Sequence, residues 1–180
     1  MAFATIDVTK GITGVTPIAN GGTALSSGFI NGTTAVGKVL QVKHASTSTA
    51  ASSTSNTYAD TNLSCSITPT SASSVLLVEI TQNGCAVSGS NFASLKLKLM
   101  RDSTTLVDPF SGDVGYRYDS SAQNRVGSSG FVYKDTSHNS TSSITYKTQL
   151  RADSGYGTVS VQTGSAYHSS MLILEVASAW

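Results

Sequence analysis

The side chains best suited to proton transfer or metal binding in this sequence are its three histidines, His44, His138 and His168. A metal site or a proton relay needs such side chains at short, defined spacings or brought together by neighbouring elements. These three lie far apart, beside different turns or strand ends. We therefore expect each to be an imidazole on the protein surface, and we expect no pair of them to bind a metal ion.

The acidic residues offer a second possible chemistry, because Asp108, Asp113 and Asp119 fall close together and carboxylate oxygens are ligands for Ca²⁺. Their spacing matches no calcium-binding loop, so turn formation is the favoured interpretation. Glu79 and Glu175 each stand alone within an apolar strand. We expect each of these two to pair with a lysine or arginine at an interface or at the rim of the fold.

Nucleophilic and hydrolytic chemistry has no recognisable signature in the chain. Serine occurs throughout, so the joint presence of serine, histidine and aspartate carries no weight. There is no nucleophile elbow, phosphate-binding loop or dinucleotide fingerprint, and no carboxylate pair in a setting suited to glycoside hydrolysis. The sequence thus predicts no catalytic residue, no cofactor, no metal and no enzyme.

The two cysteines, Cys65 and Cys85, are also expected to be structural. Cys65 falls on the inward face of its strand, where a buried thiol acts as a small apolar group. A disulfide between the two is the less favoured alternative.

The aromatic residues of the second half are the one hint of ligand binding, because rings beside short polar side chains make sugar-binding surfaces. Packing in the core or between subunits is the competing interpretation. Four tyrosines are candidate glycan contacts: Tyr116, Tyr118, Tyr133 and Tyr156.

Composition narrows the class of protein. The chain has 180 residues, of which 39% are hydrophobic and 12% charged, with a net charge of +1. This length suits one domain, and the charged fraction is about half the usual value, with polar turn residues making up the difference. Net charge near zero argues against nucleic acid or an anionic membrane as a partner. Neither a secretory signal nor an apolar run of membrane-spanning length is present.

The element around which the fold is expected to form is Leu63–Thr81, which has the pattern of strand, turn and strand. Cys65 and Ile67 alternate with polar residues, which predicts one apolar and one wet face. Pro69 ends this limb because proline lacks an N–H. The second limb, Val75–Ile80, is apolar at nearly every position, as is typical of a central strand.

Regular strand signals continue along the chain from Lys38. We expect Asp108-Pro109 to break one strand, and the glycines of another to bulge it. The pattern predicts an all-β fold, an antiparallel β-sandwich of the jelly-roll type, over residues 38–180. The further strands are expected at Val39–Lys43, Leu95–Leu99, Thr104–Val107, Val114–Tyr118, Val126–Lys134, Ile144–Arg151, Thr158–Gln162 and Ser170–Ala177.

Residues 1–37 differ from the rest, because glycines interrupt every candidate element and only short apolar pairs remain. Such an extended arm cannot form a core, and at about 3.3 Å per residue it could reach about 120 Å. It is either a disordered tail or an arm that orders on a partner or on sister chains. The candidate anchors for docking are Ile6, Val8, Val15 and Ile18.

Two segments resemble bacteriophage structural proteins. Gly14–Val42, with the sequence GVTPIANGGTALSSGFINGTTAVGKVLQV, resembles the PIANGGTGLS and GQVLQV phrases of phage tail fibres, but has Ala24 where those phrases have glycine. Thr47–Val78 resembles a domain of marine and cyanobacterial phage structural proteins, and Met171–Val176 fits its closing strand. The resemblance implies a trimeric β-sandwich on a virion, but no particular site.

Three functions remain open. The first is a capsid decoration (cement) protein, a homotrimer on the phage capsid surface that binds the major capsid protein through its arm and stabilises the shell; a contact with the host surface is left open. The second is a tail-fibre or receptor-binding tip that binds tail proteins and a host surface glycan. The third is a small polysaccharide-degrading spike, which the missing carboxylate pair disfavours. The decoration function is preferred to the tail-fibre function, because a fibre generally needs a shaft. In this sequence the arm leads directly into one sandwich, without the heptads or repeats that would build a shaft. The expected location is the virion, after assembly in the host cytoplasm.

Overall fold

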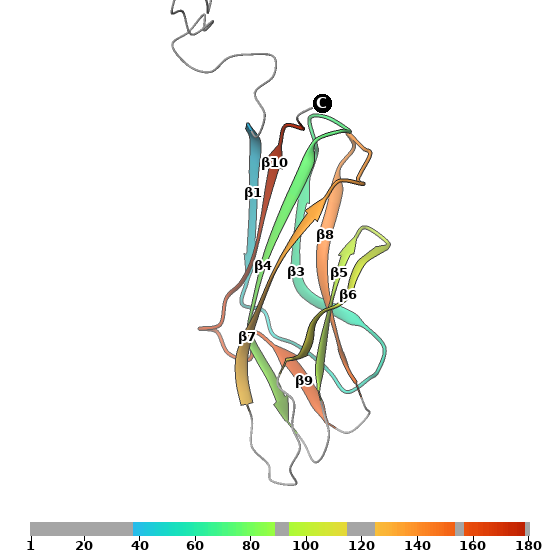
Figure 1. Cartoon of the computed structure of the whole chain (residues 1–180). Helices are drawn as coiled ribbons and strands as arrows, with labels where there is room; N and C mark the ends of the chain where they lie inside the picture. The colour runs from blue at the N-terminus through green and yellow to red at the C-terminus, as the bar shows by residue number, and fades with distance from the viewer. Residues whose placement is uncertain (1–37, 89–93, 115–124, 154–156, 179–180) are drawn as a thin grey trace, which may run out of the picture. The chain divides into compact units, whose positions relative to one another are not determined.

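The computed structural model describes residues 38–88, 94–114, 125–153 and 157–178, with only the backbone of 111–114 and 125–126. Val39–Ser178 form one compact unit. Every regular element in the described ranges is a β-strand, which confirms the all-β prediction (Figure 1). The strands are β1 (Val39–Thr47), β2 (Ala51–Ser53), β3 (Ala59–Ile67), β4 (Val75–Ser88), β5 (Leu95–Arg101), β6 (Thr104–Val114), β7 (Arg125–Asp135), β8 (Ile144–Ala152), β9 (Thr158–Val161) and β10 (Ser169–Val176).

These strands form two antiparallel sheets that pack face to face (Figure 1). Sheet A has the order β1-β10-β4-β9-β2, and β7 pairs with the other edge of β4. Sheet B has the order β3-β8-β5-β6. Strand β4 is therefore central, as its two-sided apolar sequence predicted: β10 covers its first half, β9 its end, and β7 most of its opposite edge.

The strand order is that of a jelly roll. Without the short β2 and β9, the sheets read β1-β10-β4-β7 and β3-β8-β5-β6. Successive strands cross from one sheet to the other, except at the β5–β6 hairpin. Eight strands in two sheets connected in this way are the double Greek-key arrangement of jelly rolls. The expected antiparallel sandwich is confirmed.

The connection between β3 and β4 differs from the expected strand pair, because β3 pairs with β8 in sheet B while β4 lies in sheet A.

Glu175 fixes the turn that connects the two strands. Its buried carboxylate accepts hydrogen bonds from the Thr70 N–H at 2.8 Å and from the Gln41 amide at 2.6 Å. The prediction that Glu175 pairs with a lysine or arginine is therefore wrong. Strand alternation points its side chain into the sandwich, where the carboxylate accepts hydrogen bonds from the N–H groups of the turn and of Gln41.

The core follows the predicted alternation. Leu97 and Leu99 on β5 are fully buried while Lys98 between them is only partly buried, and Tyr146 and Leu150 on β8 are likewise fully buried. Long apolar side chains from both sheets meet between the layers. They include Leu63, Ile67, Leu76, Val78, Ile80, Leu95, Met171 and Ile173.

The expected break at Asp108-Pro109 does not occur, because β6 continues through both residues to Val114. β6 is the edge strand of sheet B, and edge strands are among the places where a sheet tolerates a proline. The pairing of β5 with β6 also shifts register between Leu97 and Leu99, which accommodates the proline.

Candidate functional site

The outer face of sheet A is the feature of this sandwich that most needs explanation. Strand alternation places Ile173 of β10 and Val78 of β4 in the core. Their neighbours along each strand therefore point outward. The register aligns Val42 on β1, Leu174 on β10 and Leu77 on β4 in one row across the sheet. Lys134 on β7 ends this row.

A second row lies beside the first and consists of His44, Leu172, Glu79 and Val132. Side chains directly opposite each other on neighbouring strands have Cβ atoms about 5 Å apart, so the two rows are contiguous. Val42 is 55% exposed and Val132 62% exposed, while the leucines are partly exposed. We call the apolar members of these rows, Val42, Leu77, Leu172, Leu174 and Val132, the sheet A patch.

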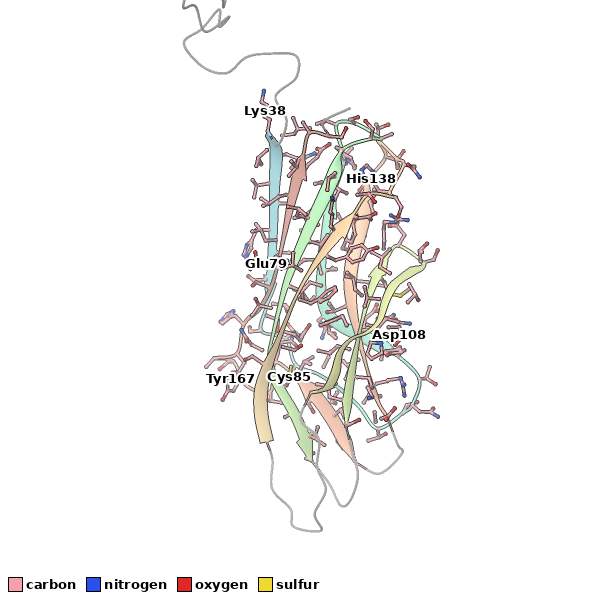
Figure 2. All side chains as sticks on the ribbon, viewed as in Figure 1. Lys38, Glu79, Cys85, Asp108, His138 and Tyr167 are labelled. Atoms are coloured by element: carbon pink, nitrogen blue, oxygen red, sulfur yellow. The ribbon has the colours of Figure 1, made fainter. Side chains whose placement is uncertain are left out.

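Glu79 lies within the sheet A patch, about halfway along the sheet, and is exposed (Figure 2). It borders a shallow hollow of about 220 Å³ that His44, Leu172, Thr81 and Ser170 also line. One carboxylate and one imidazole among hydroxyl groups are too few ligands for a metal ion. Among the described residues, no group of three or more metal-ligating side chains is present.

The outer face of sheet B is polar instead. Ser64 and Ser66 alternate outward on β3, and Lys147 and Gln149 do so on β8. A groove of about 370 Å³ lies here, and Asp60 within it accepts hydrogen bonds from Lys147 at 3.0 Å and Gln149 at 2.7 Å. Burial raises the pKa of Asp60, but these hydrogen bonds outweigh it and hold that pKa below its usual value. The carboxylate is thus already paired, as in an ordinary hydrated sheet face.

Asp108, on the side of sheet B (Figure 2), accepts a hydrogen bond from the Tyr58 hydroxyl. The Lys98 ammonium lies 4.2 Å from the centre of the Tyr58 ring. Burial and the Asp108 bond raise the pKa of Tyr58 to about 12. The other two aspartates of the calcium hypothesis, Asp113 and Asp119, have side chains outside the described residues.

His138 corrects the expectation that all three histidines lie on the surface, because it is only 7% exposed. Its Nε2 lies 2.8 Å from the Ser74 carbonyl oxygen, and its Nδ1 lies 3.2 Å from that of Ser140. The imidazole therefore fastens the loop after β7 to the start of β4. His44 and His168 are exposed as expected.

The remaining buried ionisable groups join the two sheets. Asp135, at the end of β7, accepts hydrogen bonds from Arg101 and Tyr146 of sheet B, each at 2.7 Å. Burial raises the pKa of Asp135, but the bonds from Tyr146, Ser137 and Arg101 outweigh it and hold that pKa below its ordinary value. Burial, together with the Asp135 carboxylate, raises the pKa of Tyr146. These roles are structural, and no alternating pattern in the sequence pointed to them.

Cys65 and Cys85 are free and buried. Burial raises the pKa of the Cys65 thiol, and it raises that of Cys85 to about 12. Both side chains belong to the core rather than to a reactive site.

Of the candidate glycan contacts, Tyr133 is described. It is partly buried, and its ring lies 6.5 Å from that of Phe131, which in turn stacks on Phe110 at 5.6 Å. Its glycan role stays a prediction. The other candidates, namely Tyr116, Tyr118 and Tyr156 and the arm anchors Ile6, Val8, Val15 and Ile18, lie outside the described residues.

Comparison with known proteins finds neither a matching protein-family model nor a matching curated protein. Among solved structures, similarity is found to VP2 of infectious bursal disease virus in a subviral particle, with 10% identity and a TM-score of 0.40 over 78% of this chain. A structure of the Gx strain of the same virus gives 10% identity and a TM-score of 0.38 over 77%. The chain spans 38% and 37% of those two chains.

Similarity at this level does not establish a relationship, so function is inferred from the chain's own features. In the described part of the protein, no helix has the length and apolar character needed to span a bilayer.

Proposed function

We propose that this protein is a structural component of a phage virion: a trimeric decoration protein on the capsid surface that stabilises the shell. The supporting observation is the described sandwich. Val39–Ser178 form one compact unit, and among the described residues its core cluster is built from residues between Ala45 and Ile173. We propose residues 1–37 as the segment that contacts a partner.

The arm supplies the proposed attachment to the major capsid protein. Ordering a chain segment costs about 1–2 kcal/mol per residue, and a glycine-rich segment with few apolar side chains offsets little of this by itself. Contacts with a shell protein would offset it, through Ile6, Val8, Val15 and Ile18. The phage-like phrases in Gly14–Val42 and Thr47–Val78 support a virion as the setting.

The jelly roll is compatible with this role, because the architecture recurs in viral capsid and lectin domains. Fold alone does not decide function. Within the sandwich, the described side chains offer one hydrated face on sheet B and one apolar face on sheet A, and the latter favours contacts with protein. A role in protein assembly therefore explains more of the surface than an enzymatic role does.

A tail-fibre tip that binds a host glycan is the second candidate, favoured by the likeness of Gly14–Val42 to tail-fibre phrases. Copy number separates the two locations. Quantified gels of purified particles should show hundreds of copies for a decoration protein and a few tens at most for a tail part.

The decisive experiment adds purified full-length protein to shells that lack it and measures occupancy and resistance to heat. Serine at Ile6, Val8, Val15 and Ile18 together should abolish occupancy. Serine at the polar arm positions Thr5, Thr9, Thr16 and Asn20 is the matched control and should leave occupancy unchanged. Failure of the full-length protein to bind such shells would overturn the decoration proposal and favour the tail location.

A further inference from the structure

The two outer faces of this sandwich have opposite character. Outward positions of sheet B carry serine, threonine, lysine and glutamine, as expected where a sheet faces water. The corresponding positions on three adjacent strands of sheet A carry Val42, Leu174 and Leu77 in one row and Leu172 in the next. A contiguous apolar patch on a protein surface is often an interaction site.

The size of the sheet A patch limits what it can bind. With strands about 4.8 Å apart and outward residues about 6.8 Å apart along each strand, the two rows across four strands cover about 260 Å². A standard two-protein interface takes about 800 Å² from each partner. A contact between copies would therefore also bury surface outside the sheet A patch.

The charges around the sheet A patch indicate the partner. Glu79 lies within it, while His44 and Lys134 lie on its two flanks, on β1 and β7. All three are exposed, and none of them has a hydrogen-bond or ion-pair partner among the described residues. A uniformly acidic or basic partner would leave one kind of charge unpaired, whereas a copy of the same chain brings both. The net charge of +1 also means that copies repel one another little.

We propose that the sheet A patch is the contact face between copies of this chain, with Glu79 of one copy paired to Lys134 or His44 of the next. The inference deepens the proposed function, since it names the surface by which the proposed trimer assembles. The residues before Lys38 and a shell protein are the other occupants that the experiment distinguishes.

The first test compares full-length wild type with Leu174→Lys by light scattering at micromolar concentration. Wild type should be an oligomer, and Leu174→Lys should raise the dissociation constant at least about 100-fold, because a buried contact would then contain an unpaired charge. Ser66→Lys, an exposed position on sheet B, is the matched control and should leave the mass unchanged. A monomeric wild type, or a Leu174→Lys protein with the mass of wild type, overturns the proposal.

A charge exchange keeps the proposal testable if Leu174→Lys does not fold, because the exchanged residues are exposed. Glu79→Lys and Lys134→Glu should each weaken association, and the double variant should restore it at least in part. If neither single variant shifts the association equilibrium, pairing between copies is wrong.

Shell binding is measured separately on the same proteins. Oligomers that depend on the sheet A patch but do not bind shells would leave this inference intact and overturn the decoration proposal. Monomers that bind shells would overturn this inference, and loss of that binding in Leu174→Lys would assign the sheet A patch to the shell protein. If the wild type is a monomer and the thiol of Leu174→Cys reacts with a labelling reagent only after deletion of residues 1–37, the sheet A patch is assigned to the arm.

Discussion

The Tyr146 hydroxyl on β8 donates a 2.7 Å hydrogen bond to the Asp135 carboxylate on β7, and this bond connects the two sheets at a buried position. Arg101 of β5 forms an ion pair with the same carboxylate at 2.7 Å. One acid from sheet A thus holds two strands of sheet B, close to where His138 fastens the following loop. This end of the sandwich is fixed by polar contacts as well as by the apolar core.

Tyr146→Phe should therefore destabilise the fold while leaving the ring in place. The expected loss of unfolding free energy is about 1.5–3 kcal/mol, the range for hydrogen bonds to charged groups. Urea unfolding measures it. Tyr133→Phe is the control, because no described residue forms a hydrogen bond with the Tyr133 hydroxyl. Equal unfolding midpoints for the two variants would mean that the Asp135 bond contributes nothing measurable.

The two buried carboxylates should make the protein sensitive to acid. Although burial raises the pKa values of Asp135 and Glu175, their hydrogen bonds hold both below the ordinary range. A carboxyl group with a lower pKa in the folded state adds stability that is complete above its unfolded pKa of about 4. That stability is lost as pH falls through the folded value. We expect the unfolding free energy to be flat above about pH 5 and to fall steeply below about pH 4.

A single variant isolates one of these contributions. Glu175→Gln should flatten the acid limb of a plot of unfolding free energy against pH, since it removes one of the two groups. Asp153→Asn changes an exposed acid outside the core and is the matched control. The prediction fails if the acid limb of Glu175→Gln superimposes on that of wild type.

The face assignment of β5 can be tested at two adjacent residues. Leu97→Ala removes a fully buried side chain and should cost about 2–5 kcal/mol, as other large-to-small core changes do. Lys96→Ala removes an outward lysine whose ion pair with Asp153 spans 3.8 Å, and it should cost about 1 kcal/mol or less. Equal shifts in melting temperature for the two variants would contradict the assignment.

Much of the fold follows from local patterns, because strand alternation records which face is buried. The leucines of β5 and the run from Ile144 to Leu150 are buried as their spacing predicts. The two-sided apolar sequence of β4 correctly indicates a central strand. The short β2, Ala51–Ser53, has too few residues for a periodic signal, and its pairing with β9 depends on distant parts of the chain.

The polar interior could not be predicted in this way. Gln82 accepts a hydrogen bond from the Thr148 hydroxyl at 3.0 Å and donates one to Ser169, so three distant strands share a buried polar network. His138 and Glu175 are likewise buried because a turn brings carbonyl or N–H groups to them. No spacing in the sequence encodes such partners. The sheet A patch could have been predicted from β10, because the outward Leu172 and Leu174 alternate with the inward Met171 and Ile173, which are also apolar.

Gly84 lies just before the segment in which β4 pairs with β9. The pairing of β4 with β7 shifts register between Gln82 and Cys85, so the bulge expected from the glycines of β7 falls on β4 instead. Gly84 has a φ of 61°, and a Cβ there would lie 2.8 Å from the Thr163 nitrogen and 2.9 Å from the Tyr167 Cβ. Only glycine adopts this conformation without strain.

Gly84→Ala should therefore lower the unfolding free energy by at least about 1 kcal/mol, from left-handed backbone strain plus the backbone clash. Gly127→Ala is the matched control on the facing strand, because a Cβ there meets nothing within 4 Å. Urea unfolding of both variants gives the difference. Since β4 pairs with β9 only after the bulge, amide hydrogen exchange in Gly84→Ala should increase most in Ala86–Ser88 and Thr158–Ser160. Equal stability of the two alanine variants would show that the bulge adjusts without glycine, and that the register shift is not set at this residue.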